Sequence, residues 1–224
     1  MPTSEQRRLV DLSHEIRHGM ITYPGLPGPE IGDYLTRQES RETYALGTEF
    51  QIGRVTMISN TGTYVDTPFH RFGDGADLAR FPLHRLTDLE GIVVRPRVGR
   101  RAIDRAELTP YNVRGRAVLV HTEWSRHWGT PEYGAGGHPF LTEEAARWLA
   151  AESAALVGID SLNVDDTADG ARPAHTVLLG ACIPVVEHLR GLSQLPDAGF
   201  RFHAAPPAVA GMGTFPVRAY AVLT

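Results

Sequence analysis

Only one cysteine occurs in the 224-residue sequence, so no disulfide bond can form within the chain. A cysteine-poor chain is typical of a reducing compartment, and we therefore expect a cytoplasmic protein. Cys182 lies in the apolar run 179–184. Because a nucleophilic thiol needs an electropositive environment, this setting predicts a small buried core residue instead.

Long apolar runs are missing as well. No stretch approaches the roughly 20 apolar residues that a membrane-spanning helix needs. Residues 1–11 hold too few apolar side chains for a signal sequence, which needs a continuous apolar region. We therefore expect no membrane partner.

A concentrated basic surface is the third absence. The net charge is −4, and the basic residues are scattered along the chain rather than gathered into a stripe. The densest basic stretch, residues 95–105, has no interleaved aromatic residues and is interpreted as a solvated loop. Without a stripe to neutralise a phosphate backbone, nucleic acid is not expected as a partner.

The chain has the composition of one globular domain. With 42% hydrophobic residues it can bury a substantial core, and its length suits a single domain over residues 1–224. Short runs rich in β-branched residues predict strands at 7–12, 50–57, 91–94, 117–120, 155–159, 200–203 and 217–222. Helices are predicted at 142–150, after the N-cap Thr142, and at 174–182, after Pro173. This alternation indicates an α/β fold with a mixed sheet and packed helices.

Candidate metal ligands stand out in residues 60–70, which read Asn-Thr-Gly-Thr-Tyr-Val-Asp-Thr-Pro-Phe-His. Carboxylate and imidazole groups that converge and leave one position open for water form a hydrolytic metal site. Asp66, His175 and Glu187 can supply such a trio. His70 follows Asp66 by four residues, beyond the bend at Pro68, and is either a further ligand or the general base.

At these residues the chain resembles the cyclase and bacterial kynurenine formamidase family of metal-dependent hydrolases, whose signature is His-x-Gly-Thr-His-x-Asp-x-Pro-x-His. The resemblance extends to residues 11–14, 23–25, 158–165 and 175–187. It implies that Asp66, His175 and Glu187 bind metal and that His70 is the acid/base. It also implies a swivelling β/β/α fold and a homodimer or homotetramer.

Two positions depart from the signature, because Asn60 and Tyr64 stand where the family has histidines. This places the chain in a subgroup. An amide is a poor ligand, and a phenol binds metal well only when it is deprotonated. We therefore expect one divalent ion at most, zinc or manganese, or an unusually loose pair. Tyr64 and Asn60 are candidate catalytic donors to a developing oxyanion; alternatively, they only pack and satisfy each other.

These observations predict hydrolysis of a small non-peptide amide, formamide or lactone by metal-activated water, as in arylformamidases. Two alternatives stay open. One is a metal-free cyclase or isomerase in which His70, Asp66 and Tyr64 act on a polyketide-like or enolisable substrate. The other is a non-catalytic ligand-binding relative.

Further aromatic and histidine residues have open roles. Tyr23, Phe69, Phe72 and Trp124 either line a pocket for a flat substrate or pack in the core. The segment from His121 to His138, which includes His127, is rich in aromatic, glycine and polar residues and is a candidate cover for the site. Replacement of a missing ligand by one of its histidines is the less favoured hypothesis, because their spacing fits no compact zinc pattern.

Overall fold

The computed structural model describes residues 7–223, and a nine-stranded mixed sheet organises them. The strand order is β1-β13-β11-β5-β7-β9-β10-β4-β12, with β5, β7, β9 and β10 mutually parallel. The strands are β1 Arg8–Asp11, β4 Tyr64–Asp66, β5 Leu89–Val94, β7 Ala117–Val120, β9 Leu156–Ile159, β10 Val185–Glu187, β11 Ala198–His203, β12 Thr214–Pro216 and β13 Tyr220–Leu223.

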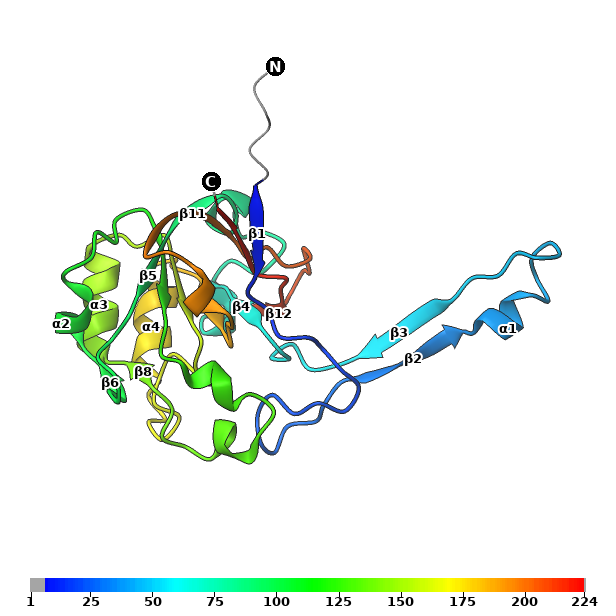
Figure 1. The fold of residues 1–224 in the computed structure, drawn as a ribbon, viewed down its shortest axis with the longest axis horizontal. Coiled ribbons are helices and arrows are strands. Elements are labelled where there is room, and N and C mark those ends of the chain that lie inside the picture. The colour runs from blue at the N-terminus through cyan, green and yellow to red at the C-terminus, as the bar shows by residue number, and fades with distance from the viewer. Residues whose placement is uncertain (1–6, 224) are drawn as a thin grey trace, which may run out of the picture.

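Helices cover one face of this sheet (Figure 1). They are α2 Arg105–Leu108, α3 Glu143–Ala151 and α4 Pro173–Gly180. Short 3-10 turns occur at Pro68–His70, Leu83–Arg85, Trp124–His127, Pro131–Gly134 and Leu192–Gln194, and a small parallel pair joins β6 Ala102–Ile103 to β8 Phe140–Leu141. Within the described residues, no helix is long and apolar enough to cross a membrane.

Two hydrophobic cores lie on opposite faces of the sheet. Along β7, Ala117 and Leu119 belong to one core, whereas Val118 and Val120 belong to the other, which also takes in α3 and α4. This assignment follows from the two-residue period of a strand, which sends successive side chains to opposite faces. The first core joins β1, β11 and β13 to the centre of the sheet, so the sheet is curled.

An arm projects from this body (Figure 1). It consists of residues 30–56, which comprise β2 Glu30–Leu35, α1 Arg37–Ser40, the connection 41–51 and β3 Ile52–Thr56, and β2 and β3 pair only with each other. Helix α1 begins with a capping box, in which Thr36 and Glu39 satisfy each other's backbone amides. The strand predicted at 50–57 is therefore present, but it lies in the arm rather than in the main sheet.

The α/β single-domain prediction is confirmed, with corrections at particular elements. Helix α4 ends at Gly180, short of the predicted residue 182. Cys182 is exposed, not buried, because the chain turns there with a left-handed φ of 56°. The last strand begins at Tyr220 rather than at Val217, whose backbone amide instead donates to Thr63 O at 2.9 Å.

Candidate active site

A hollow of about 360 Å³ brings the predicted site residues together. It opens where β10 ends at Glu187 and where α4 begins. Asn60, Tyr64, His70, His175 and Glu187 line it, together with Tyr23, Leu26, Arg71, Asn163 and Arg172. Asp66, at the end of β4, lies beneath them and is buried. Residues more than 100 positions apart in the sequence therefore meet in one place.

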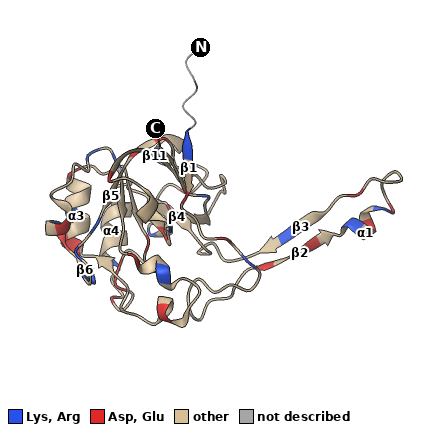
Figure 2. Ribbon diagram, viewed as in Figure 1, with Lys and Arg blue, Asp and Glu red and all other residues tan. Residues whose placement is uncertain are grey.

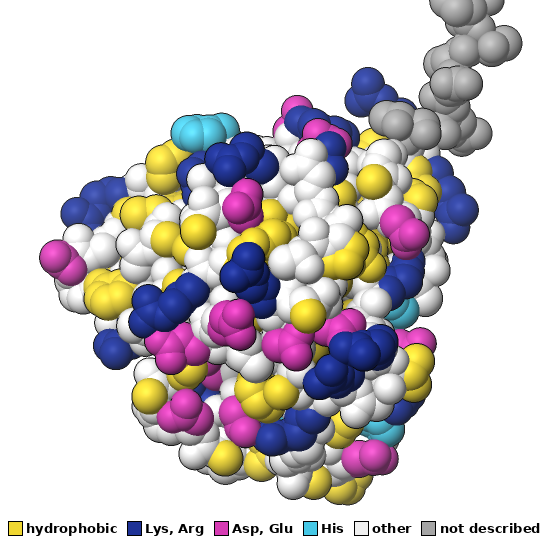
Figure 3. Space-filling view, turned by 90° about the vertical axis from the view of Figure 1, so that its left-hand side faces the viewer, with side chains coloured by type: hydrophobic (Ala, Val, Ile, Leu, Met, Phe, Trp, Pro, Cys, Tyr) yellow, Lys and Arg dark blue, Asp and Glu magenta, His cyan; other side chains and the backbone are white. Residues whose placement is uncertain are grey.

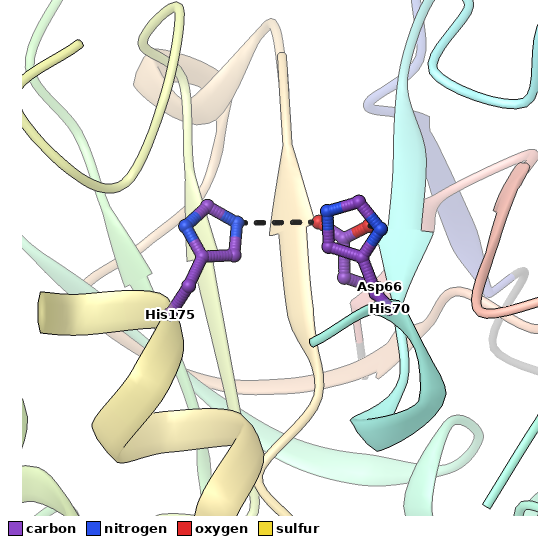
Figure 4. Close-up of side chains that lie close together, drawn as sticks. All are labelled: Asp66, His70 and His175. Carbon is purple, nitrogen blue, oxygen red and sulfur yellow. Dashed lines mark ion pairs between the residues drawn. The ribbon is translucent and has the colours of Figure 1, made fainter. Parts of the chain in front are cut away.

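Only one of the two carboxylate oxygens of Asp66 accepts a hydrogen bond from the described residues. Thr214 Oγ1 donates a hydrogen bond to Oδ1, whereas the buried Oδ2 accepts none. Oδ2 lies 3.5 Å from Nε2 of His175, which faces it, and Nδ1 of His70 lies 3.8 Å from Oδ1 of the same carboxylate (Figure 4). A buried carboxylate oxygen without a donor is costly unless a cation approaches it.

His175 is held by the start of its own helix. Asp165 accepts the Nδ1 proton of His175 at 2.7 Å, and it also accepts the backbone amides of Ala174 and His175 at 2.6 and 3.1 Å. Because Nδ1 donates, Nε2 carries the lone pair whenever the ring is neutral. Burial alone lowers the pKa of His175, but Glu187, Asp165 and Asp66 outweigh it and raise that pKa to about 10.

Two carboxylate oxygens lie close to the Nε2 atom of His175. Nε2 of His175 is 3.5 Å from Asp66 Oδ2 and 3.6 Å from Glu187 Oε1. Ligands about 2.1 Å from a tetrahedral ion are separated from one another by about 3.4 Å. His70 is also near: Asp66, His70 and His175 each offer a ligand atom within 4.8 Å of the others. The donor set therefore fits a divalent cation.

Glu187 is fixed by a network of donors. Its Oε2 accepts the Tyr64 hydroxyl at 2.5 Å, the Tyr23 hydroxyl at 3.2 Å and the Asn163 amide at 3.3 Å. Oε1 accepts the backbone amide of Val164 at 2.6 Å. Burial and the nearby Glu187 raise the pKa of Tyr64 well above its usual value, so the phenol is neutral and its proton belongs to the bond with Glu187.

The proton of Thr214 determines the tautomer of His70. Since the single hydroxyl proton goes to Asp66, Oγ1 can only accept from His70, whose Nδ1 lies 2.8 Å away. Nδ1 therefore carries a proton, and the lone pair of a neutral His70 ring is on Nε2, at the edge of the hollow that His70 lines. Such a nitrogen is suited to take a proton from a nucleophile.

The remaining candidates are placed as follows. Asn60 lines the hollow, and its Oδ1 accepts the Ser59 hydroxyl at 3.1 Å, so Asn60 and Tyr64 do not pair with each other in the bonds seen here. Tyr23 lines the hollow, as one of the two interpretations predicted. The three histidines of open role, His121, His127 and His138, are not among the residues that line this hollow.

Two residues that orient the side chains of the site were not identified from the sequence. Asp165 orients His175 from ten residues upstream, and Thr214 joins Asp66 to His70 from 148 residues downstream of Asp66. Asp165 falls in the stretch 158–165 that resembles the family, and this was its only signal. No local pattern points to Thr214, because a lone threonine in a short strand has no distinctive spacing.

Residues 10–166 match the family described as "Putative cyclase", which is more than half of the chain. The chain belongs to this cyclase family. Among its relatives in the family, the kynurenine formamidase of Erythrobacter litoralis is 28% identical over 207 residues, covering 90% of this chain and 87% of that protein. The kynurenine formamidase of Bacillus cytotoxicus is 28% identical over 217 residues, covering 94% and 95%.

Solved structures share the cyclase-family fold over nearly the whole chain. One described as a potential metal-dependent hydrolase with cyclase activity gives a TM-score of 0.78 at 26% identity, covering 97% of this chain and 98% of that one. Isatin hydrolase A from Ralstonia solanacearum gives a TM-score of 0.82 at 22% identity, covering 97% and 92%. The family and the fold that the resemblance implied are thus confirmed.

Proposed function

We propose that this cyclase-family protein is a metal-dependent hydrolase of a small non-peptide amide, formamide or lactone, similar to arylformamidases. One observation carries the proposal: Nε2 of His175 lies 3.5 Å from Asp66 Oδ2 and 3.6 Å from Glu187 Oε1. The Asp66 Oδ2 atom is buried and accepts no hydrogen bond, so it is available to a cation. The relatives named kynurenine formamidase and the neighbour named isatin hydrolase support this reaction class.

Asp66, His175 and Glu187 would hold the ion, with zinc or manganese as the candidates. A divalent cation at this position polarises a carbonyl group and lowers the pKa of water. One ion is expected, because the Tyr64 proton is committed to Glu187 and Asn60 offers only an amide. The expected loss of a second ion thus follows from the tyrosine and the asparagine that replace two histidines of the family signature.

The other residues manage the substrate and the proton. His70 accepts a proton at Nε2, since Thr214 keeps its Nδ1 protonated. Tyr23 and Tyr64 hold the Glu187 carboxylate in place and form one wall of the hollow. A hollow of about 360 Å³ lies near the lower end of the range that small ligands occupy. A substrate with one ring and one acyl bond suits this space.

Metal analysis tests the proposal. The wild-type protein should hold about one equivalent of zinc or manganese by inductively coupled plasma mass spectrometry, and His175→Ala and Glu187→Ala should lose it. His121→Ala, a histidine outside the hollow, is the control and should keep it. Hydrolysis of aryl formamides should stop on chelation and return when metal is restored. Activity that survives chelation would instead favour the metal-free cyclase or isomerase.

We also propose that the protein works as a homo-oligomer, a homodimer or homotetramer, and that the arm makes the contact. Seven large apolar side chains of the arm are exposed: Ile31, Tyr34, Tyr44, Leu46, Phe50, Ile52 and Val55. A two-stranded ribbon is marginal on its own in water, and exchange of an identical element between copies is a common route to dimers. A second copy of the chain is therefore expected to cover this surface.

We further propose a cytoplasmic location. The free, exposed Cys182 is consistent with the reducing environment of that compartment.

A further inference from the structure

A second hollow, of about 420 Å³, lies outside the proposed active site. It opens beyond the carboxyl ends of β5 and β7, where Arg95 follows Val94 and His121 follows Val120. Ligands in open α/β sheets bind at this edge. The active-site hollow occupies the β10 part of the same edge, and the lining residues of the two hollows do not overlap.

The lining of this hollow is strongly enriched in guanidinium groups. The chain contains no lysine, and all 22 of its basic residues are arginine. Five of them line the hollow: Arg95, Arg97, Arg100, Arg101 and Arg126. Glu123 is the only carboxylate among the lining residues of the described chain.

Glu123 pairs with Arg126 at 3.2 Å inside the lining, whereas the acids that pair with Arg95, Arg97 and Arg101 stand outside it. Asp197 is 3.0 Å from Arg95, Glu107 is 2.7 Å from Arg97, and Asp166 is 2.5 Å from Arg101. Figure 3 shows arginine and acidic side chains beside one another on the face that carries α2 and α3. The Arg95, Arg97 and Arg101 side chains are 36%, 67% and 44% exposed, and each guanidinium has five donors, so donors remain for a ligand.

One wall of the hollow is built in advance. The buried Asp160 carboxylate accepts the Thr122 amide and hydroxyl, each at 2.6 Å, and the Glu123 amide at 3.0 Å. These bonds hold the turn that follows β7, in which Glu123 adopts a left-handed φ of 64°. Arg95 donates to Nδ1 of His121 at 2.6 Å, and burial together with this arginine lowers the pKa of that imidazole. A wall fixed in this way loses little entropy when a ligand binds.

The hollow also has flat and apolar surface. Trp124 and the buried Ile103 line it, and the Trp124 indole N–H donates to Tyr133 O at 3.1 Å. That bond fixes the indole ring. An aromatic ring offers a stacking surface, and guanidinium groups match planar carboxylates in a two-point fashion.

We propose that this hollow binds a small anion that carries a planar ring, such as an aromatic carboxylate. The arginines receive the acidic group, and Trp124 and Ile103 receive the ring. This binding site is separate from the proposed reaction and does not depend on it.

Benzoate is the probe, and the indole N–H signals in ¹⁵N NMR spectra of the full-length protein are the readout. Benzoate should shift the Trp124 signal, assigned with Trp124→Phe, in a saturable way. Trp128, which stacks on His14 at 4.0 Å, and Trp148, in α3, should move much less. Acetate, which lacks the ring, and benzyl alcohol, which lacks the charge, should each bind at least fivefold more weakly.

Paired arginine variants locate the site. Arg100→Gln with Arg126→Gln should weaken benzoate binding at least fivefold. The matched control, Arg114→Gln with Arg147→Gln, removes two exposed arginines that pair with Glu152 and Glu143 elsewhere, and it should change the affinity less than twofold. Equal affinities in the two double variants, equal binding of acetate, or shifts confined to Trp128 would each overturn the proposal.

Discussion

At the residue scale, the site depends on where single protons lie. Thr214 gives its one proton to Asp66 and therefore accepts from His70. Asp165 takes the Nδ1 proton of His175 and leaves Nε2 for a cation. Neither residue belongs to the recognisable motif, although both decide which nitrogen of a motif histidine is available. This is why the sequence predicted the ligands but not the groups that orient them.

Replacing Thr214 by valine removes the acceptor for His70 Nδ1 while nearly preserving the side-chain volume. We expect kcat for aryl formamide hydrolysis to fall by about tenfold or more, because the base loses its preferred tautomer. Metal content should not change. Thr214→Ser, which keeps the hydroxyl, should retain most of the activity, and ¹⁵N NMR of the His70 ring should show the tautomer shift only in the valine variant. An active valine variant with an unchanged His70 spectrum would contradict this role.

The affinity for metal should rise with pH. The pKa of His175 in the metal-free protein is raised to about 10, chiefly by Glu187, Asp165 and Asp66 acting against burial. Below that pH the ring carries a proton that the ion must displace, so binding should release a proton. The apparent association constant should increase up to about tenfold for each pH unit in the range below that pKa. Calorimetric titrations in two buffers of different ionisation enthalpy measure the released proton; a pH-independent affinity would argue against His175 as a ligand.

At the element scale, continuous apolar runs made the central strands predictable. β5, β7 and β9 are rich in β-branched residues and are buried on both faces, so their hydrophobic pattern is strong. The arm was harder to predict, because the exposed residues of β3 have the composition of a sheet strand but pair only with β2. Which sheet a strand joins depends on contacts far apart in the sequence, and local composition does not encode these contacts.

The start of α4 depends on Asp165. Asp165→Asn removes the negative charge that accepts two backbone amides and the His175 ring, so we expect the free energy of unfolding of the metal-free protein to fall by about 2 kcal/mol at neutral pH. Burial opposes the charge of Asp165, but the bonds to His175 and Ala174 lower its pKa below the usual value. The contribution is therefore present above the ordinary pKa of an aspartate and is lost as the pH falls through the lowered value.

Urea denaturation of the wild-type protein and of Asp165→Asn, followed over a range of pH, measures this difference. Asp169→Asn is the control, because Asp169 is exposed and its side chain accepts a local hydrogen bond from the Ala171 amide. Its effect should stay within about 0.5 kcal/mol. Equal losses in the two variants would show that Asp165 has no special part in holding the helix.

At the scale of the whole molecule, the body and the arm differ in how their apolar residues are covered. The body has two cores on the two faces of one sheet, whereas the arm, which projects from the body (Figure 1), exposes apolar side chains. Acidic and basic residues also lie along the arm (Figure 2), which favours a specific, charge-matched contact over unspecific association. Sequence composition could not reveal this surface, because exposure depends on the complete fold.

The oligomeric state of the wild type should therefore depend on the arm. Light scattering after size exclusion should give a mass that is at least twice the 24.5 kDa of one chain. Tyr34→Ser with Phe50→Ser should shift the mass towards one chain, since these side chains are 74% and 53% exposed and removing them weakens the apolar contact. Leu83→Ser is the matched control: Leu83 is 64% exposed but lies on the body, so this variant should keep the wild-type mass. A monomeric wild type, or an equal mass for all three proteins, would contradict an interface built on the arm. Circular dichroism of the double variant should remain that of the wild type, because the arm contributes to neither core.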